Sequence, residues 1–368
     1  MLYSFSLIDL VPYLIVYIIC LLNSFKKKSS LYNIAFFVVF VFSIIRYGVG
    51  YDYFNYVDNI IEYDNSSFSA MEWLSKILYF ISQKTFHQLF FIVNSFICLF
   101  PIFFILKKYS PMPGLSFFTF MMIPLFFLES LSIVRYSSAL SMVFIAYYFY
   151  KEKQYVKYII CCLIGGGLHS SGYIGFIFLL PLLYKSTYFF NIVIYILAIA
   201  FHTYKLDNIV YLLPGGNKVI YLRLISYLSR IEPQRGLMSI IVFFIGFINL
   251  LFWKKLISIN NQNSDYLRLI NLGVFFWGLF SFNVTLSLRI SSYFLIFILL
   301  LVPSFIPLFK KKVAARSMII LFLSVYFASS FYVNIKGYTP SPSDRISYLP
   351  YQTVFYYKDY QNYKYRPR

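Results

Sequence analysis

The best candidates for chemistry in this chain are arginines that stand next to glycine, serine and carboxylate residues. The first group is Arg46-Tyr-Gly-Val-Gly-Tyr-Asp52-Tyr53, in which two glycines let the backbone turn between a guanidinium and a carboxylate. We predict that Arg46 binds an anion and that Asp52 is a candidate proton acceptor. The alternative is a structural ion pair between Arg46 and Asp52 that fixes the end of a helix.

A second group surrounds Arg135, in the segment Glu129-Ser-Leu-Ser132-Ile-Val-Arg135-Tyr-Ser-Ser138-Ala139. The spacing predicts that Arg135 shares one helical face with Ser132, Ser138 and Ala139. A charge within a membrane span costs about 2.5 to 3.5 kcal/mol on insertion scales, so Arg135 needs an anionic partner. That partner is either Glu129 or an anion that the protein binds.

The third group is Gly165-Gly-Gly-Leu-His169-Ser-Ser-Gly172, where the glycines allow close packing. The ordinary pKa of histidine lies near neutrality, so His169 is a second candidate for proton transfer. A structural histidine at the membrane interface is the alternative. The fourth group is Arg289-Ile-Ser-Ser-Tyr293, which we expect at the outer junction between two spans, with a snorkelling anchor as the alternative.

The composition sets the fold class. Of 368 residues, 60% are hydrophobic and 12% are charged, and the mean hydropathy is +0.71, which predicts an all-α polytopic integral membrane protein. The net charge of +19 does not indicate a nucleic-acid partner, because no solvated basic domain carries it. All four cysteines lie within apolar runs without metal-ligand spacing, so we expect no metal and no cofactor.

About twelve membrane spans follow from the apolar runs, in a single polytopic domain that covers residues 1–368. We expect them at about residues 7–25, 31–47, 87–106, 114–128, 131–150, 155–168, 172–184, 188–204, 237–253, 267–286, 290–309 and 314–333.

Threading these spans through a membrane separates lysine from arginine. One side receives 14 of the 21 lysines, and the other receives nine of the 11 arginines. The lysine side is cytoplasmic by the positive-inside rule, which predicts a bacterial inner-membrane protein whose arginines face the periplasm.

Three long outer segments are expected, at residues 48–86, 205–236 and 334–368. In the first, an interfacial helix should place one apolar face on lipid and a polar face opposite to it. The apolar face comprises Met71, Leu74, Leu78 and Ile81, and the polar face comprises Glu72, Ser75 and Lys76. In the second segment, Arg223 and Arg230 are seven residues apart and share a helical face.

The outer arginines favour a phosphate ligand. Guanidinium binds phosphate oxygens through two parallel hydrogen bonds, whereas a simple anchor could equally be lysine. A lipid-linked diphosphate fits this arrangement, because its polyprenyl tail would lie among apolar helices and its diphosphate would meet Arg46, Arg135, Arg289, Arg223 and Arg230.

The order of these groups resembles the EpsG-like, Wzy-type polysaccharide polymerases. The resemblance rests on Arg46-x-Gly-x-Gly-x-Asp52-Tyr53, Arg135-x-x-x-Ala139, His169-Ser-Ser and Arg289-x-x-x-Tyr293, and more loosely on Tyr348-Leu-Pro-Tyr351. Tyr136 follows Arg135 where the family pattern leads us to expect glutamine.

The resemblance implies a GT-C-like glycosyltransferase that needs no metal. Such an enzyme moves a growing glycan from undecaprenyl diphosphate to the terminal sugar of another lipid-linked repeat unit, at the periplasmic face. Membrane lipid and a chain-length regulator protein are the other candidate partners. His169 and Asp52 are both eligible as the base, and Tyr53, Tyr293 and Glu129 join the arginines as candidate ligands of the substrate.

Three rival functions use similar features. A flippase or transporter would place its polar residues near the bilayer midplane, in two related halves. An O-antigen ligase would bind the same lipid diphosphate and use lipid A core as the acceptor. A membrane acyltransferase would bury a histidine toward a tunnel that opens to the cytoplasm, whereas His169 is predicted on the outer side.

Overall fold

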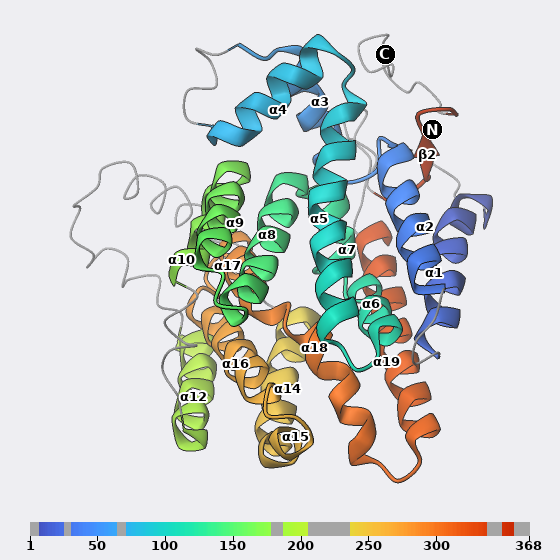
Figure 1. Ribbon diagram of the computed structural model, residues 1–368. Coiled ribbons are helices and arrows are strands. Elements are labelled where there is room, and N and C mark those ends of the chain that lie inside the picture. Colours follow the sequence, from blue (N-terminus) through green and yellow to red (C-terminus); the bar gives the residue numbers. More distant parts are fainter. Residues whose placement is uncertain are drawn as a thin grey trace, which may run out of the picture. The chain divides into compact units, whose positions relative to one another are not determined.

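The protein is described by a computed structural model. It describes residues 7–25, 31–64, 71–177, 187–204, 236–336 and 348–356. These residues are almost entirely helical, which confirms the all-α class (Figure 1). Arg223 and Arg230 lie outside the described residues, as does most of the predicted 205–236 segment.

The chain divides into two compact units, and the prediction of one polytopic domain stays a prediction. The first unit comprises residues 1–176 and 311–368, and the second comprises residues 177–310. Helices of the first unit are α1 Val11–Ser24, α2 Leu31–Ile45, α3 Tyr53–Ile61, α4 Trp73–Lys84, α5 Gln88–Tyr109, α6 Pro113–Met122, α7 Phe127–Ser132, α8 Val134–Lys151, α9 Tyr155–Leu168 and α19 Lys312–Lys336.

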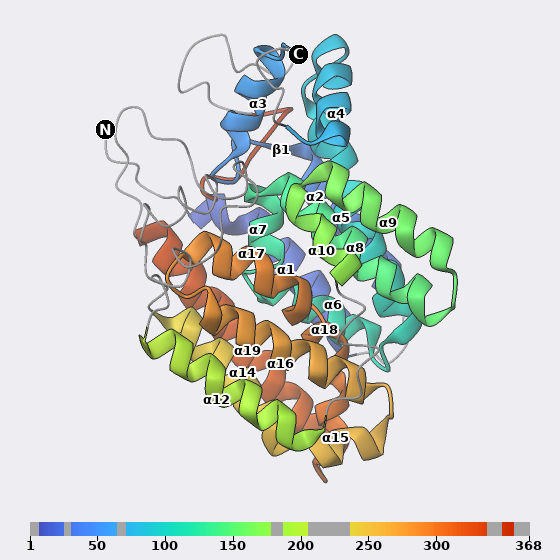
Figure 2. The ribbon, with the colours of Figure 1, turned by 90° about the vertical axis from the view of Figure 1, so that its left-hand side faces the viewer.

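In this first unit, Arg46 and Arg135 lie at the end of the helices opposite to Lys108, whereas Arg316 lies at the Lys108 end, beside Phe25 and Met112. At one end, Lys108 from the end of α5 pairs with Glu152 after α8, with 3.3 Å between the nitrogen and oxygen atoms. The other end holds the end of α2, the beginning of α8 and the end of α9, which carry Arg46, Arg135 and His169. Helices α3 and α4 lie at this arginine end, as Figures 1 and 2 both show.

A short C-terminal segment packs at the arginine end. Strand β1, Arg46–Tyr47, pairs antiparallel with strand β2, Gln352–Thr353. The hydroxyl of Tyr348 makes a 2.9 Å hydrogen bond with Ser132 Oγ and also donates to the carbonyl of Leu128. A segment far along the chain from both therefore joins the end of α2 to the turn between α7 and α8.

Glycine allows the turn after β1 to contact the turn between α7 and α8. Gly50 has a φ of +104°, and a Cβ there would lie 2.1 Å from the carbonyl oxygen of Leu131. The N–H of Tyr51 then donates to Ser132 Oγ over 3.2 Å. Only glycine tolerates both the positive φ and the close backbone approach.

Helix α4 is present where an interfacial helix was predicted, but its faces differ from the prediction. Ser75, Tyr79 and Ser82 are buried, and Met71 and Leu78 pack against a cluster rich in tyrosine and phenylalanine. The exposed apolar side chains are Trp73, Ile77 and Phe80, together with Ile81, which alone of these four was predicted to face lipid. The sequence pattern did not reveal that the small polar residues of α4 would contact protein.

The second unit consists of helices on either side of the undescribed residues 205–235. Its elements are α12 Tyr188–Tyr204, α14 Leu237–Leu251, α15 Trp253–Ile259, α16 Asn263–Leu279, α17 Val284–Leu295, α18 Ile298–Leu301 and the 3-10 helix Val302–Leu308. Helices α14 and α15 are bent by 68° where they meet.

Three described helical stretches are long and apolar enough to cross a membrane, or four if the bent pair is counted as one. The three are Gln88–Tyr109, Val284–Leu308 and Lys312–Val333, and several other apolar helices are shorter. The protein is therefore an all-α membrane protein, and twelve spans remain a prediction. Several boundaries differ from the prediction. The expected span 114–128 is interrupted between α6 and α7, the expected span 131–150 is interrupted at Ile133, and Arg289 lies inside α17 rather than at a junction.

We predict that Gly50→Ala destabilises the protein by at least about 2 kcal/mol, because the new methyl group meets a backbone carbonyl at a positive φ. Gly165→Ala is the matched control: its Cβ would make ordinary contacts from 3.4 Å, and alanine favours helix by up to about 1 kcal/mol. Thermal unfolding in detergent measures both variants. Equal unfolding temperatures for the two would contradict the packing described for Gly50.

Candidate functional site

The centre of the candidate site is an ion pair between Arg135 and Glu72. Arg135 stands in the first turn of α8, and Glu72 immediately precedes α4. The guanidinium Nη1 lies 2.8 Å from Oε2 of Glu72, and the two side chains are 21% and 17% exposed. The pair is thus half-withdrawn from solvent, where a charge-assisted hydrogen bond is stronger than at an open surface.

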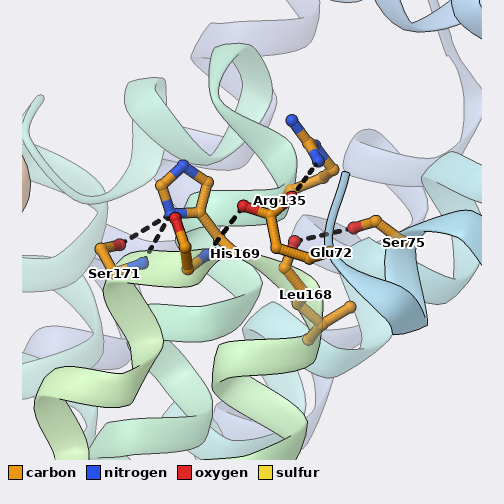
Figure 3. Close-up of polar contacts among 7 residues, drawn as sticks. Glu72, Ser75, Arg135, Leu168, His169 and Ser171 are labelled. Atoms are coloured by element: carbon orange, nitrogen blue, oxygen red, sulfur yellow. Dashed lines mark hydrogen bonds and ion pairs between the residues drawn. The ribbon is translucent and has the colours of Figure 1, made fainter. Parts of the chain in front are cut away.

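The second oxygen of Glu72 reaches the turn after α9. Its Oε1 accepts a hydrogen bond from the backbone N–H of Ser170 over 2.9 Å. One carboxylate therefore joins the beginning of α8 to the His169 turn (Figure 3). A third contact fixes the same region, because the Ser75 hydroxyl on α4 donates to the carbonyl of Leu168 over 2.7 Å.

Hydrogen bonds to Ser171 define the tautomer of His169. The imidazole Nδ1 lies 2.7 Å from Ser171 Oγ and 3.3 Å from the backbone nitrogen of Ser171. A backbone N–H can only donate, so Nδ1 accepts, and the neutral ring carries its proton on Nε2. The ring also packs edge-on against Tyr136, with 5.7 Å between centroids. His169 is therefore arranged to donate a hydrogen bond through Nε2.

The glycines around His169 make this turn possible. A Cβ on Gly172 would lie 2.3 Å from the carbonyl carbon of Gly165, so the chain doubles back directly onto α9. A Cβ on Gly167 would lie 2.5 Å from the indole of Trp73, the residue after Glu72. The predicted role of the glycines in close packing is thus confirmed, and their packing brings α4 and Glu72 to the His169 turn.

The pKa of Glu72 reflects two opposing effects. Burial alone raises the pKa of its carboxyl group, but the Arg135 charge and the Ser170 amide stabilise the ionised form more strongly. The resulting pKa lies below the ordinary value of about 4.5. Glu72 is therefore ionised at neutral pH.

Arg46 is placed differently from Arg135. Its side chain is fully buried, donates to the backbone carbonyls of Ser43 and Leu131, and lies 5.2 Å from the ring centroid of Phe91. It does not pair with Asp52, which is half-buried and accepts a hydrogen bond from Asn55 over 3.2 Å. The proposed structural ion pair between Arg46 and Asp52 is thus not formed.

Tyr53 is buried beside Arg46. Its ring stacks on Phe91 with centroids 4.3 Å apart, and its hydroxyl donates to Oε1 of Gln88 over 3.0 Å. Its hydroxyl and ring thus contact the protein interior. Asp52, the preceding residue, begins α3 next to the Tyr51 amide that is bound to Ser132.

Two expectations about the Arg135 segment are wrong. The carboxylate that pairs with Arg135 is Glu72, whereas Glu129 lies on the separate short helix α7, where its charge acts on Tyr51 and Tyr348. Ser132 also belongs to α7, because the helix is interrupted at Ile133. The hydroxyl of Ser138 is directed to Asn94 on α5. Ser138 and Ala139 follow Arg135 by three and four residues in α8 and share its helical face, so the prediction fails for Ser132 alone.

The remaining predicted residues belong to the second unit. Arg289 is half-buried on α17, and Tyr293, one turn later on the same helix, is buried. Asn283 caps the beginning of α17 by accepting a hydrogen bond from the N–H of Leu286 over 2.9 Å. Among the described residues, no group of three or more histidine, cysteine or acidic side chains could hold a metal ion.

Sequence reasoning did not identify Glu72 as a site residue. The only signal was a carboxylate directly before an amphipathic helix, and that position is also typical of a helix N-terminus. Glu72 and Arg135 are 63 positions apart in sequence, and nothing in that separation gave a reason to pair them.

We predict that the protein loses stability at acidic pH because the Glu72–Arg135 ion pair is lost. The pKa of Glu72 is lower in the folded protein than in the unfolded chain. The contribution of its carboxylate to the free energy of unfolding is therefore complete above about pH 4.5, and it is lost as the pH falls through the pKa of the folded state. Glu72→Gln should cost about 1 to 3 kcal/mol at pH 7 and should flatten the acid dependence of thermal unfolding. Glu152→Gln, in an exposed pair, is the control and should have little effect. Parallel acid profiles for wild type and Glu72→Gln would contradict this account.

Comparison with protein families supports the resemblance seen in the motifs. The EpsG family model matches residues 29–353. Comparisons with curated proteins and with solved structures give no match. The matched residues include Arg46, Arg135, His169, Arg289 and the segment that contains Tyr348, and they form most of the chain, so this protein belongs to the EpsG family.

Proposed function

We propose that the protein is a polysaccharide polymerase of the bacterial inner membrane. It transfers a glycan chain from undecaprenyl diphosphate to the terminal sugar of a second lipid-linked repeat unit, and its arginine end faces the periplasm. EpsG family membership supports a polymerase-like, glycosyltransferase role. The observation that carries the proposal further is Arg135, a guanidinium 21% exposed at the arginine end of the first unit, which Glu72 joins to the His169 turn.

The proposed reaction forms one glycosidic bond. The acceptor hydroxyl oxygen attacks the anomeric carbon of the donor sugar, the bond from that carbon to the phosphate oxygen breaks, and undecaprenyl diphosphate leaves as an anion. The acceptor proton passes to a base. Negative charge grows on the diphosphate in the transition state, so fixed cationic donors accelerate this step.

Arg135 is the proposed ligand of the departing diphosphate. Its guanidinium can present two parallel N–H donors to phosphate oxygens, and its partly exposed position leaves it within reach of a ligand. Arg289, Arg223, Arg230 and Tyr293 remain proposed ligands of the substrate. Arg46 and Tyr53 are proposed to position the Gly48–Asp52 turn, because both are enclosed by protein.

Asp52 is the proposed base. The tautomer of His169 argues against that histidine, because Nδ1 already accepts from Ser171 and Nε2 carries the proton. Asp52 is half-buried and has one carboxylate oxygen bonded to Asn55. Its turn is fixed through Tyr51 to Ser132, three residues before Arg135. We assign to His169 a hydrogen bond from Nε2 to a substrate oxygen.

The decisive test uses purified protein with a synthetic lipid-linked repeat unit. We predict a ladder of chain lengths for wild type and a loss of about 10² to 10³ in rate for Arg135→Ala. Arg135→Lys should also lose at least about tenfold, since lysine cannot form the bidentate contact.

Lys108→Ala is the matched control, because Lys108 forms an ion pair at the opposite end of the same unit. It should keep the ladder. Transfer to a lipid A core acceptor without a ladder would indicate a ligase. Transport of the lipid-linked unit with no chain extension would indicate a flippase, and normal extension by Arg135→Ala would remove Arg135 from the site.

We further predict that pH profiles distinguish the two candidate bases. His169→Ala should weaken substrate binding and keep the acid limb of kcat/KM, whereas Asp52→Asn should lower kcat and abolish that limb. Initial rates of chain extension between pH 4 and pH 9 measure both. Loss of a limb near pH 6 to 7 in His169→Ala, with a normal profile for Asp52→Asn, would reverse the assignment.

A further inference from the structure

The Arg135–Glu72 pair has the form of an occupied anion site. One carboxylate oxygen accepts from the guanidinium at 2.8 Å, and the other accepts from the Ser170 N–H at 2.9 Å. Guanidinium and backbone N–H groups are also the donors that proteins use for phosphate oxygens. The carboxylate of Glu72 thus holds positions that two phosphate oxygens could hold.

Arg135 cannot bind a diphosphate favourably while it is still paired with Glu72. Arg135 and Glu72 together carry no net charge, so the intact pair offers little attraction to a phosphate group, and Glu72 repels it directly. Arg46, the other arginine described at this end, is fully buried against carbonyl groups. A diphosphate that reaches Arg135 therefore gains most if Glu72 leaves.

The geometry also allows Glu72 to leave. Its backbone is extended, with φ of −63° and ψ of 139°, and the residue lies before the first turn of α4. Its backbone carbonyl still accepts from the N–H of Lys76 over 3.0 Å, so a rotation of the side chain need not disturb the helix. The side chains of Arg135 and Glu72 are 21% and 17% exposed, so their contact lies at a boundary that a ligand can approach.

We propose that Glu72 is a resident anion that the diphosphate of the lipid-linked substrate displaces, so that phosphate oxygens replace its carboxylate on Arg135 and on the Ser170 amide. This inference rests on the proposed function. It adds a residue that sets the affinity of the site: Glu72 keeps Arg135 paired while the site is empty, and it opposes ligands too weakly charged to replace a carboxylate. When product diphosphate departs, Glu72 returns to Arg135.

The test measures binding of inorganic pyrophosphate to the purified full-length protein in nanodiscs at neutral pH. Glu72→Gln should bind pyrophosphate at least about tenfold more tightly than wild type, because the competing charge is removed while a side chain of the same size remains. Glu152→Gln, which neutralises the carboxylate paired with Lys108, should leave the affinity unchanged. Arg135→Ala should abolish the binding in both the wild-type and the Glu72→Gln background.

If Glu72→Gln bound pyrophosphate no more tightly than wild type, or not at all, the proposed displacement would be wrong. Glu72 would then be a fixed structural link between Arg135 and Ser170. A second measurement needs no variant: pyrophosphate should raise the rate at which a carbodiimide labels Glu72 in wild type, by several-fold, since the displaced carboxylate becomes accessible. An unchanged labelling rate would likewise overturn the proposal. These two measurements test only the exchange. The polymerase function is tested separately, by the chain-length ladder and its loss in Arg135→Ala, so failure of one proposal can be told from failure of the other.

Discussion

The need to neutralise a guanidinium at the edge of an apolar helix bundle organises the first unit of this protein. Arg135 enters α8 at that edge, and its partner Glu72 comes from a different helix, 63 residues earlier. Because the same carboxylate also binds the Ser170 amide, neutralising Arg135 fixes the His169 turn as well. Removing Glu72 would thus release two parts of the candidate site together, in addition to leaving a half-buried charge unpaired.

The arrangement of the site also requires segments of backbone to pack closely together, and glycine allows this at two points. Gly50 lets the turn after β1 contact the carbonyl of Leu131, and Gly172 lets the His169 turn fold back onto α9. Each contact brings a polar segment to the beginning of α8. The C-terminal segment completes the arrangement, because the Tyr348 hydroxyl reaches the same Ser132 that binds the Tyr51 amide. Two distant parts of the sequence, around Gly50 and Tyr348, therefore meet at the turn between α7 and α8.

The sequence predicted the features that depend on local chemistry. Apolar runs predicted the helical membrane class, and the bounds of α9 and α12 agree with the expected spans 155–168 and 188–204. Arg46 and Arg135 lie opposite Lys108, as predicted, and which of the two ends faces the cytoplasm stays a prediction. Long-range pairing was not predictable: Glu129 was nearer to Arg135 in sequence, but the chain breaks at Ile133 and places it on another helix. The buried face of α4 was also missed, since serine there contacts protein through hydrogen bonds rather than apolar contact. The roles of Asp52 and Arg289 in the site stay predictions.

Arg46 and Arg135 show why residue type alone does not assign a role. Both stand at helix ends on the arginine side of the first unit, and both motifs resemble those of the family. Arg46 is enclosed, and both of its terminal nitrogens donate to backbone carbonyls, which cannot leave without unfolding the turn. Arg135 is paired with a side chain that can rotate away, and it is still partly exposed. A binding arginine needs a partner that a ligand can replace, and of these two only Arg135 has one. The distinction arises from tertiary packing, because the contact of α4 with the glycines of α9 is what places Glu72 beside Arg135.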